Sequence, residues 1–166
     1  MSDLAVVERQ LGRPPRAFRR VAARCPWGLP AATEQAPYDT SGEPFPTTYY
    51  LTCPHLVAAI ARVEAAGGVE RWSSAVERDP QLAASVMRAA DEQRAVRRRL
   101  APPGPGTDGG AALERGIAGA SRPERLKCLH AHAAHALARR GTYRLGEQLL
   151  AELEPLWPGV CCMEGG

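Results

Sequence analysis

The chain has 166 residues and a mass of 17.8 kDa, which is long enough to bury a hydrophobic core without disulfide bonds. Hydrophobic residues make up 45% of the sequence and charged residues 23%, close to the averages for globular proteins, so global disorder is excluded. The net charge of +3 is too small to indicate a nucleic-acid-binding protein. No apolar run reaches the length of about 18 residues that indicates a membrane span.

The first third of the sequence predicts a short helix followed by a small antiparallel sheet. Apolar residues recur at helical spacing over residues 3–11, and Gly12 marks the end of that helix. We expect residues 17–24 and 31–36 to form two antiparallel strands joined by a tight turn. Residues 45–52 are dense in β-branched and aromatic side chains and predict a third strand.

From residue 53 onward the pattern is helical. Thr52 is the expected cap of a helix that ends at Gly67-Gly68, and residues 69–78 predict a shorter helix. Asp79-Pro80 has the composition that opens a helix, and four arginines lie in its last turns.

The last third contains a loop and two further helices. Residues 101–110 hold three prolines and four glycines, which is typical of a surface loop. Ser121 and Glu124 have capping-box spacing and predict a helix that continues to Arg140, and residues 145–153 predict a final helix. The expected fold is therefore α+β in a single domain, residues 1–166, with a small antiparallel N-terminal sheet of about three strands within residues 1–52 packed on a mainly helical portion, residues 53–166.

The segment from Lys127 to Leu137 carries most of the candidate chemistry, because it gathers three of the four histidines and one of the five cysteines. On a helix with about 100° per residue, Cys128, His132 and His135 share one face, while His130 points to the opposite side. Thiol and imidazole groups suit a soft divalent metal. We expect a zinc site that uses Cys25, Cys128 and His135, with His132, His130 or a tail cysteine as the fourth ligand. The alternative is that these are ordinary buried side chains.

Several short motifs occur in one order along the chain. They are Leu11-Gly12-Arg13-x-Pro15-Arg16, Arg24-Cys25-Pro26-x-Gly28-x-Pro30, Ala36-Pro37, Pro44-Phe45-Pro46-Thr47-x-Tyr49-Tyr50-Leu51-Thr52 and Lys127-Cys128-Leu129-His130 followed by His135-x-Leu137. Together, over about residues 7–147, they resemble the actinobacterial domain-of-unknown-function family number five hundred and one. The resemblance implies a small intracellular bacterial protein without an assigned reaction, and the family pattern includes Cys25, Cys128, His130 and His135 of this chain but not His132.

The favoured function is a non-catalytic protein that holds a structural or regulatory zinc ion, and two alternatives stay open. One is an enzyme with Cys128 as nucleophile and His132, one helical turn away, as its base. The other is an adaptor without metal, in which Tyr49 and Tyr50 could stack on bases. Its basic surface would come from the arginines at positions 16, 19, 20, 24 and 97–99.

Partners and location follow from composition alone. The weak positive charge favours a protein partner over nucleic acid, and nothing in the sequence indicates a membrane partner. The start of the sequence lacks the basic and apolar regions of a signal peptide, so we expect a cytoplasmic protein. Five cysteines in that reducing compartment are better read as ligands, nucleophiles or core residues than as disulfide partners.

Overall fold

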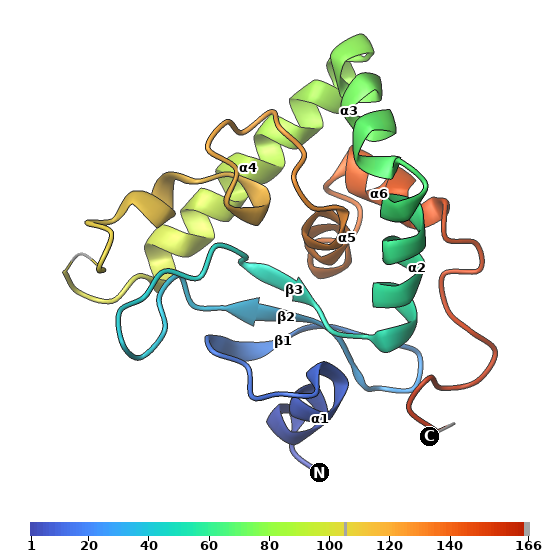
Figure 1. Cartoon of the computed structure of the whole chain (residues 1–166), viewed down its shortest axis with the longest axis horizontal. Helices are drawn as coiled ribbons and strands as arrows, with labels where there is room; N and C mark the ends of the chain where they lie inside the picture. The colour runs from blue at the N-terminus through green and yellow to red at the C-terminus, as the bar shows by residue number, and fades with distance from the viewer. Residues whose placement is uncertain (105, 165–166) are drawn as a thin grey trace.

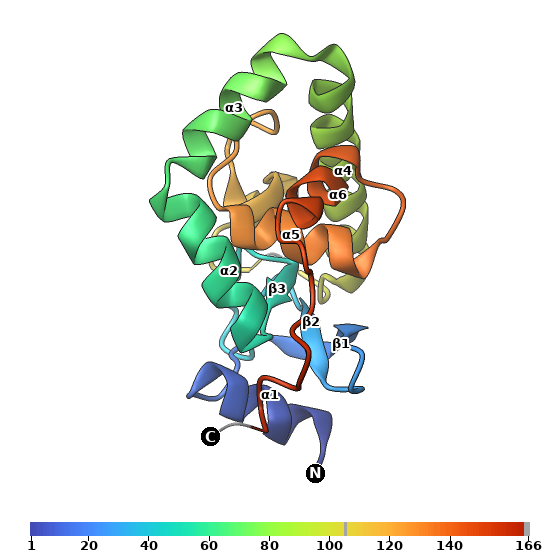
Figure 2. The same ribbon diagram turned by 90° about the vertical axis from the view of Figure 1, so that its right-hand side faces the viewer.

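The structure is a computed structural model that describes residues 1–104 and 106–164. Within these residues a three-stranded antiparallel sheet near the N-terminus is combined with six α-helices, which confirms the predicted α+β class (Figure 1). The helices cover the sheet on both faces. Helix α1 (Asp3–Leu11) lies on one face and α5 (Leu129–Ala138) on the other, as two perpendicular views show (Figures 1 and 2).

The sheet has the strand order β1-β2-β3. Strands β1 (Phe18–Arg24) and β2 (Pro30–Gln35) lie within one residue of the predicted bounds, whereas β3 (Tyr49–Leu51) has only three residues of the eight expected. The shortening has a simple cause, because prolines cannot donate a backbone hydrogen bond to a neighbouring strand. Pro44 and Pro46 precede β3, and Pro44 makes only an isolated bridge to Tyr38.

Three helices follow the sheet: α2 (Pro54–Ala65), α3 (Gly68–Arg78) and α4 (Pro80–Leu100). The predicted bounds hold closely, with one correction at the start of α2, where the capping position is Cys53 rather than Thr52. The predicted cap of α4 is confirmed, since the Asp79 carboxylate accepts hydrogen bonds from the amides of Gln81 and Leu82. This cap satisfies backbone donors that the helix leaves unpaired.

Helix α5 is the central element of the core. It packs against β3 and against the last helix, α6 (Arg144–Ala151), and eight of its ten residues are buried. Four of these are alanines, whose small side chains let the helix backbone approach the sheet closely. This part of the core is therefore built largely from small aliphatic side chains.

The predicted helix from Ser121 to Arg140 is wrong in its first part. Residues 121–124 form bends and a turn, residues 125–128 have no regular secondary structure, and α5 begins only at Leu129. Pro123 explains the failure of the capping-box prediction, because a proline disfavours the helical conformation of the residue before it, here the first residue of the proposed helix. The preceding stretch forms two short 3₁₀ turns, η1 (Ala111–Glu114) and η2 (Ile117–Gly119).

The arginine cluster at the end of α4 lies only partly on the surface, since Arg98 and Arg99 are exposed and Arg97 is not. Arg97 is wholly buried, and its guanidinium donates hydrogen bonds to the carbonyls of Ala112 and Phe45 and to the Thr48 hydroxyl. Arg98 pairs with Glu114 at 2.6 Å. Arg97 therefore fixes the segment that leads into β3, and it is unavailable to an external partner.

None of the helices in the described parts of the chain combines the length and apolar composition that crossing a membrane requires.

Candidate metal centre

Three side chains with metal-binding atoms converge between α2 and the start of α5. One oxygen of Glu64, the sulfur of Cys128 and a ring nitrogen of His130 all lie within 4.8 Å of one another. Among the described residues, this is the one group of three or more histidine, cysteine or acidic side chains with that proximity. The three residues are called the ECH cluster below.

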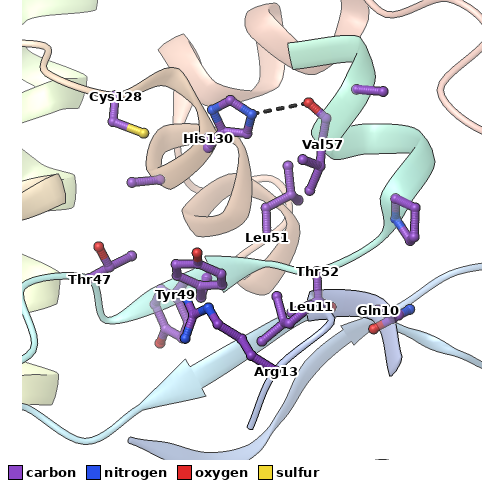
Figure 3. Close-up of a pocket in the computed structure, with 14 residues that line it drawn as sticks. Gln10, Leu11, Arg13, Thr47, Tyr49, Leu51, Thr52, Val57, Cys128 and His130 are labelled. Atoms are coloured by element: carbon purple, nitrogen blue, oxygen red, sulfur yellow. Dashed lines mark hydrogen bonds between the residues drawn. The ribbon is translucent and has the colours of Figure 1, made fainter. Parts of the chain in front are cut away.

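His130 is held between two acceptors that orient its ring. Its Nε2 lies 3.1 Å from the carbonyl oxygen of Val57 (dashed line in Figure 3), and its Nδ1 lies 2.5 Å from a Glu64 carboxylate oxygen. A carbonyl oxygen can only accept a hydrogen bond, so Nε2 must carry a proton. Nδ1 is consequently the ring atom that faces the cluster, and it can carry either a second proton or a metal ion.

Cys128 occupies the N-cap position of α5 in an extended conformation, with φ −146° and ψ 113°. This explains why the helical-wheel prediction failed for His130, since that argument assumed that Cys128 lies inside the helix. One residue of extended backbone at the helix start turns the thiol towards His130 instead of towards His132. The wheel placement of His130 opposite Cys128 is therefore wrong.

The electrostatics of the ECH cluster favour a thiolate beside a protonated imidazole. Burial alone would raise the pKa of the Cys128 thiol, but His130 and the Ala131 amide outweigh it and the pKa falls below its ordinary value. Contact with Cys128 raises the pKa of His130 to about 9 against the opposing effect of burial, and Val57 and Glu64 add to the rise. The cluster thus places a sulfur and a carboxylate oxygen around one nitrogen that can bind either a proton or a metal.

A cavity of about 580 Å³ opens beside the ECH cluster, and Cys128 and His130 line it. Figure 3 shows these two side chains at one end of the view, with Val57 beside His130, and Arg13 at the other end, with Leu51 between them. The size lies within the range of small-molecule sites. A group bound at the cluster would therefore face a space large enough for a small organic molecule.

The remaining predicted ligands lie apart from this cluster. Cys25 sits in the turn between β1 and β2, where its amide bonds to the Leu29 carbonyl and its side chain is buried in the core. His132 and His135 project from the buried faces of α5, and each is only 1% exposed. The structure brings Cys128 together with His130 and Glu64, and it does not place Cys25, His132 or His135 in that group.

The two buried histidines belong to an internal network. Nδ1 of His132 lies 2.6 Å from the Tyr143 hydroxyl, and Nε2 of His135 lies 3.4 Å from a Glu92 oxygen. His135 packs edge-on against both Tyr49 and Tyr143, with ring centroids 5.4 Å apart in each case. Burial lowers the pKa of both histidines to about 3, so both are neutral at physiological pH.

The residues proposed for an adaptor surface are largely engaged within the chain. Tyr49 is buried, and Tyr50 is partly buried with its ring 6.1 Å from that of Phe45. Lys127 is exposed. Three of the N-terminal arginines form ion pairs: Arg16 with Asp39, Arg20 with Glu34 and Arg24 with Asp3.

Sequence reasoning missed Glu64 and Val57, both in α2. Glu64 lies 66 residues from His130, and no spacing rule relates a carboxylate near the end of one helix to an imidazole at the start of another. Only the packing of α2 against α5 brings them together.

Comparison with known families agrees with the motif resemblance. A family model described as "Protein of unknown function (DUF501)" matches residues 21–151. The chain belongs to this family. All three residues of the ECH cluster lie within the part that matches DUF501, whereas Arg13 precedes it. No curated protein and no solved structure matches the chain.

Proposed function

We propose that this DUF501 protein binds one zinc ion through Glu64, Cys128 and His130 and uses the open side of that ion to bind a small molecule in the adjoining cavity. The observation that carries the proposal is the hydrogen bond from His130 Nε2 to the Val57 carbonyl. Histidines that bind metals usually donate their second ring N–H to a carbonyl or carboxylate, which fixes the tautomer and aims the other nitrogen at the metal.

The donor set matches the preferences of zinc. Thiolate sulfur, imidazole nitrogen and carboxylate oxygen bind Zn²⁺ at about 2.0–2.3 Å, which places tetrahedral ligand atoms roughly 3.3–3.8 Å apart. The ligand atoms of the ECH cluster already lie within 4.8 Å of one another. Replacing the proton on Nδ1 by zinc requires the His130–Glu64 contact to widen by about 1 Å, which rotation of the Glu64 side chain can supply.

Three protein ligands leave a fourth zinc position open, as in catalytic sites, whereas closed structural sites use four. Because Cys128 and His130 line the cavity, we place the fourth position on that side. The site then has the form of a binding or reactive centre. The partner that it favours is a small molecule rather than a protein or a nucleic acid.

A second candidate function is supported by the position of Cys128 at the N-terminus of α5. A thiol at a helix N-terminus beside an imidazole is activated as a thiolate nucleophile. The base in such an enzyme would be Nδ1 of His130, whose ring is oriented by the bond from Nε2 to the Val57 carbonyl, and not His132, whose Nδ1 bonds to Tyr143. This reading uses Cys128 and His130 without a metal.

Metal analysis of the protein purified without added metal separates the two functions. We expect close to one equivalent of zinc in the wild-type protein, and at least a tenfold loss of zinc affinity, measured by competition with a chromophoric chelator, in Cys128→Ser and Glu64→Gln. The matched controls are Cys162→Ser and Glu77→Gln, which change exposed residues outside the cluster. Circular dichroism checks that each variant is folded.

Two results would overturn the zinc proposal. One is less than a tenth of an equivalent of zinc that cannot be raised by reconstitution. The other is zinc retained equally by Cys128→Ser and by its control. If zinc is absent and iodoacetamide alkylates Cys128 faster than the other cysteines near neutral pH, the nucleophile function replaces it.

A further inference from the structure

We infer that the cavity beside the ECH cluster takes a small organic acid, whose carboxylate pairs with Arg13 and whose far end carries a donor to the metal. The inference rests on the proposed function at the metal-facing end of the cavity, where Cys128 and His130 lie. The anion-facing end, where Arg13 lies, depends on residues that the zinc proposal does not use.

The first observation is an arginine without a carboxylate partner. Arg13 lines the cavity, and no acidic side chain of the described residues lies within ion-pair distance of its guanidinium. Of the next four arginines along the chain, Arg16, Arg20 and Arg24 each pair with a carboxylate at 2.7–2.8 Å, whereas the exposed Arg19 pairs with no carboxylate of the described residues. A guanidinium is suited to hold a carboxylate in a bidentate pair.

The second observation concerns the charge of the lining. None of the described residues that line the cavity is an aspartate or a glutamate, and Glu64 contacts His130 without lining the space. With Arg13 at one end, and a divalent cation bound at the other, the cavity complements an anion. A cationic ligand would meet unfavourable charge at the Arg13 end, and it would offer no anionic donor to the open position of the metal.

The third observation is a pair of buried polar atoms that the described part of the chain leaves without hydrogen-bond partners. They are Oε1 of Gln10 and the Thr52 hydroxyl, and both residues line the cavity. The assignment of Oε1 is secure, because the Gln10 amide nitrogen donates to the Pro30 carbonyl at 2.8 Å. Unpaired buried polar atoms are costly, so a ligand with an N–H or O–H group would be stabilised here.

The apolar part of the lining sets the character of the ligand body. Leu51 lies between Arg13 and the cluster in Figure 3, Val57 lies beside His130, and Leu11, Ala58 and Ala131 add further apolar surface. A straight aliphatic chain of a few carbons suits this middle section. The inferred class is therefore an aliphatic acid with a second oxygen donor at its far end and a polar N–H or O–H group along its body.

Straight-chain dicarboxylates from glutarate to suberate test the inference over a range of lengths, with the corresponding diamides as uncharged controls. Isothermal titration calorimetry on the zinc-loaded protein is expected to show at least tenfold tighter binding of the best dicarboxylate than of its diamide. Adding a hydroxyl group, as in 2-hydroxyadipate, should tighten binding relative to adipate, because it supplies an uncharged donor for the unpaired oxygens of Gln10 and Thr52.

Arg13→Gln should weaken the binding of the best dicarboxylate about tenfold. The control is Arg88→Gln, which changes an exposed arginine of α4 away from the cavity and should leave that affinity unchanged. Zinc content is measured on the same samples. This inference alone is overturned if the protein binds zinc but binds dicarboxylates no more tightly than diamides. It is also overturned if Arg13→Gln binds the best dicarboxylate as tightly as the wild type does. Arg13-dependent binding in a protein that takes up no zinc contradicts the proposed function and the metal-facing end, and it supports the anion-facing end.

Discussion

Lowering the pH from 6.5 to 5.0 should destabilise the fold through the two buried histidines of α5. His132 and His135 have folded-state pKa values of about 3, because burial disfavours their charged forms, against an ordinary value of 6.5. When the folded-state pKa is depressed, the unfolded chain binds protons that the folded chain cannot. The contribution of the two neutral histidines to the free energy of unfolding is fully present above pH 6.5, and it is lost progressively as the pH falls towards 3.

The size of this effect follows from the pKa difference between the folded and unfolded states, since each pKa unit corresponds to about 1.36 kcal/mol. Between pH 6.5 and 5.0 each buried histidine costs about 1.5 kcal/mol, so the pair costs about 3 kcal/mol, a large part of the 5–15 kcal/mol typical of a domain. Carboxylates contribute little in this window, since their ordinary pKa values of 3.8 and 4.5 lie below it. The raised pKa of His130 acts mainly above pH 6.5, where stability falls as the pH rises towards 9.

Urea unfolding of the metal-free protein at the two pH values measures this loss. The wild-type protein should lose about 3 kcal/mol, and His135→Phe, which keeps an aromatic ring between Tyr49 and Tyr143, should lose only about half as much. An equal loss in both proteins, or no loss in the wild type, would refute the claim that these histidines are buried in the neutral form.

Three further predictions concern the packing and the cysteines. Arg97→Ala leaves buried acceptors unpaired and should lower the free energy of unfolding, measured with urea, by about 3–5 kcal/mol. An unchanged free energy of unfolding would contradict this. Gly146→Ala would bring a Cβ within 2.6 Å of core side chains and should destabilise the fold by about 1–3 kcal/mol, whereas Gly159→Ala places its Cβ in open space and should have little effect. Equal melting temperatures for the two variants would contradict this. The sulfurs of Cys53 and Cys162 lie 3.7 Å apart, so oxidation by diamide should join them in a disulfide. Peptide mapping should find this disulfide in the wild type and not in Cys162→Ser, and a disulfide between other cysteines would contradict the geometry.

The parts of the fold that local sequence determines could be predicted. The helix over residues 3–11 ends where Gly12 supplies a left-handed residue with φ +69°, and Asp79 caps α4 through its own side chain. Strands β1 and β2 followed from composition and the intervening turn. The third strand was overestimated because the effect of Pro44 and Pro46 on strand pairing outweighed the strand preference of the residues around them.

The candidate site depended on longer-range packing and could be predicted only in part. The sequence singled out Cys128 and the neighbouring histidines, but a single extended residue at the start of α5 decides which imidazole the thiol meets. A helical wheel cannot detect that residue. Glu64 and the Val57 carbonyl come from a different helix, so their role depends on how α2 packs against α5.

X-ray absorption at the zinc edge tests the central claim most directly, because it reports the atoms that bind the metal in the purified, zinc-loaded protein. The ECH cluster predicts one sulfur at about 2.3 Å and two or three nitrogen or oxygen atoms at about 2.0–2.2 Å. Cys128→Ser should remove the sulfur contribution. A wild-type spectrum without sulfur, or with two or more sulfur ligands, would contradict a zinc site formed by Glu64, Cys128 and His130.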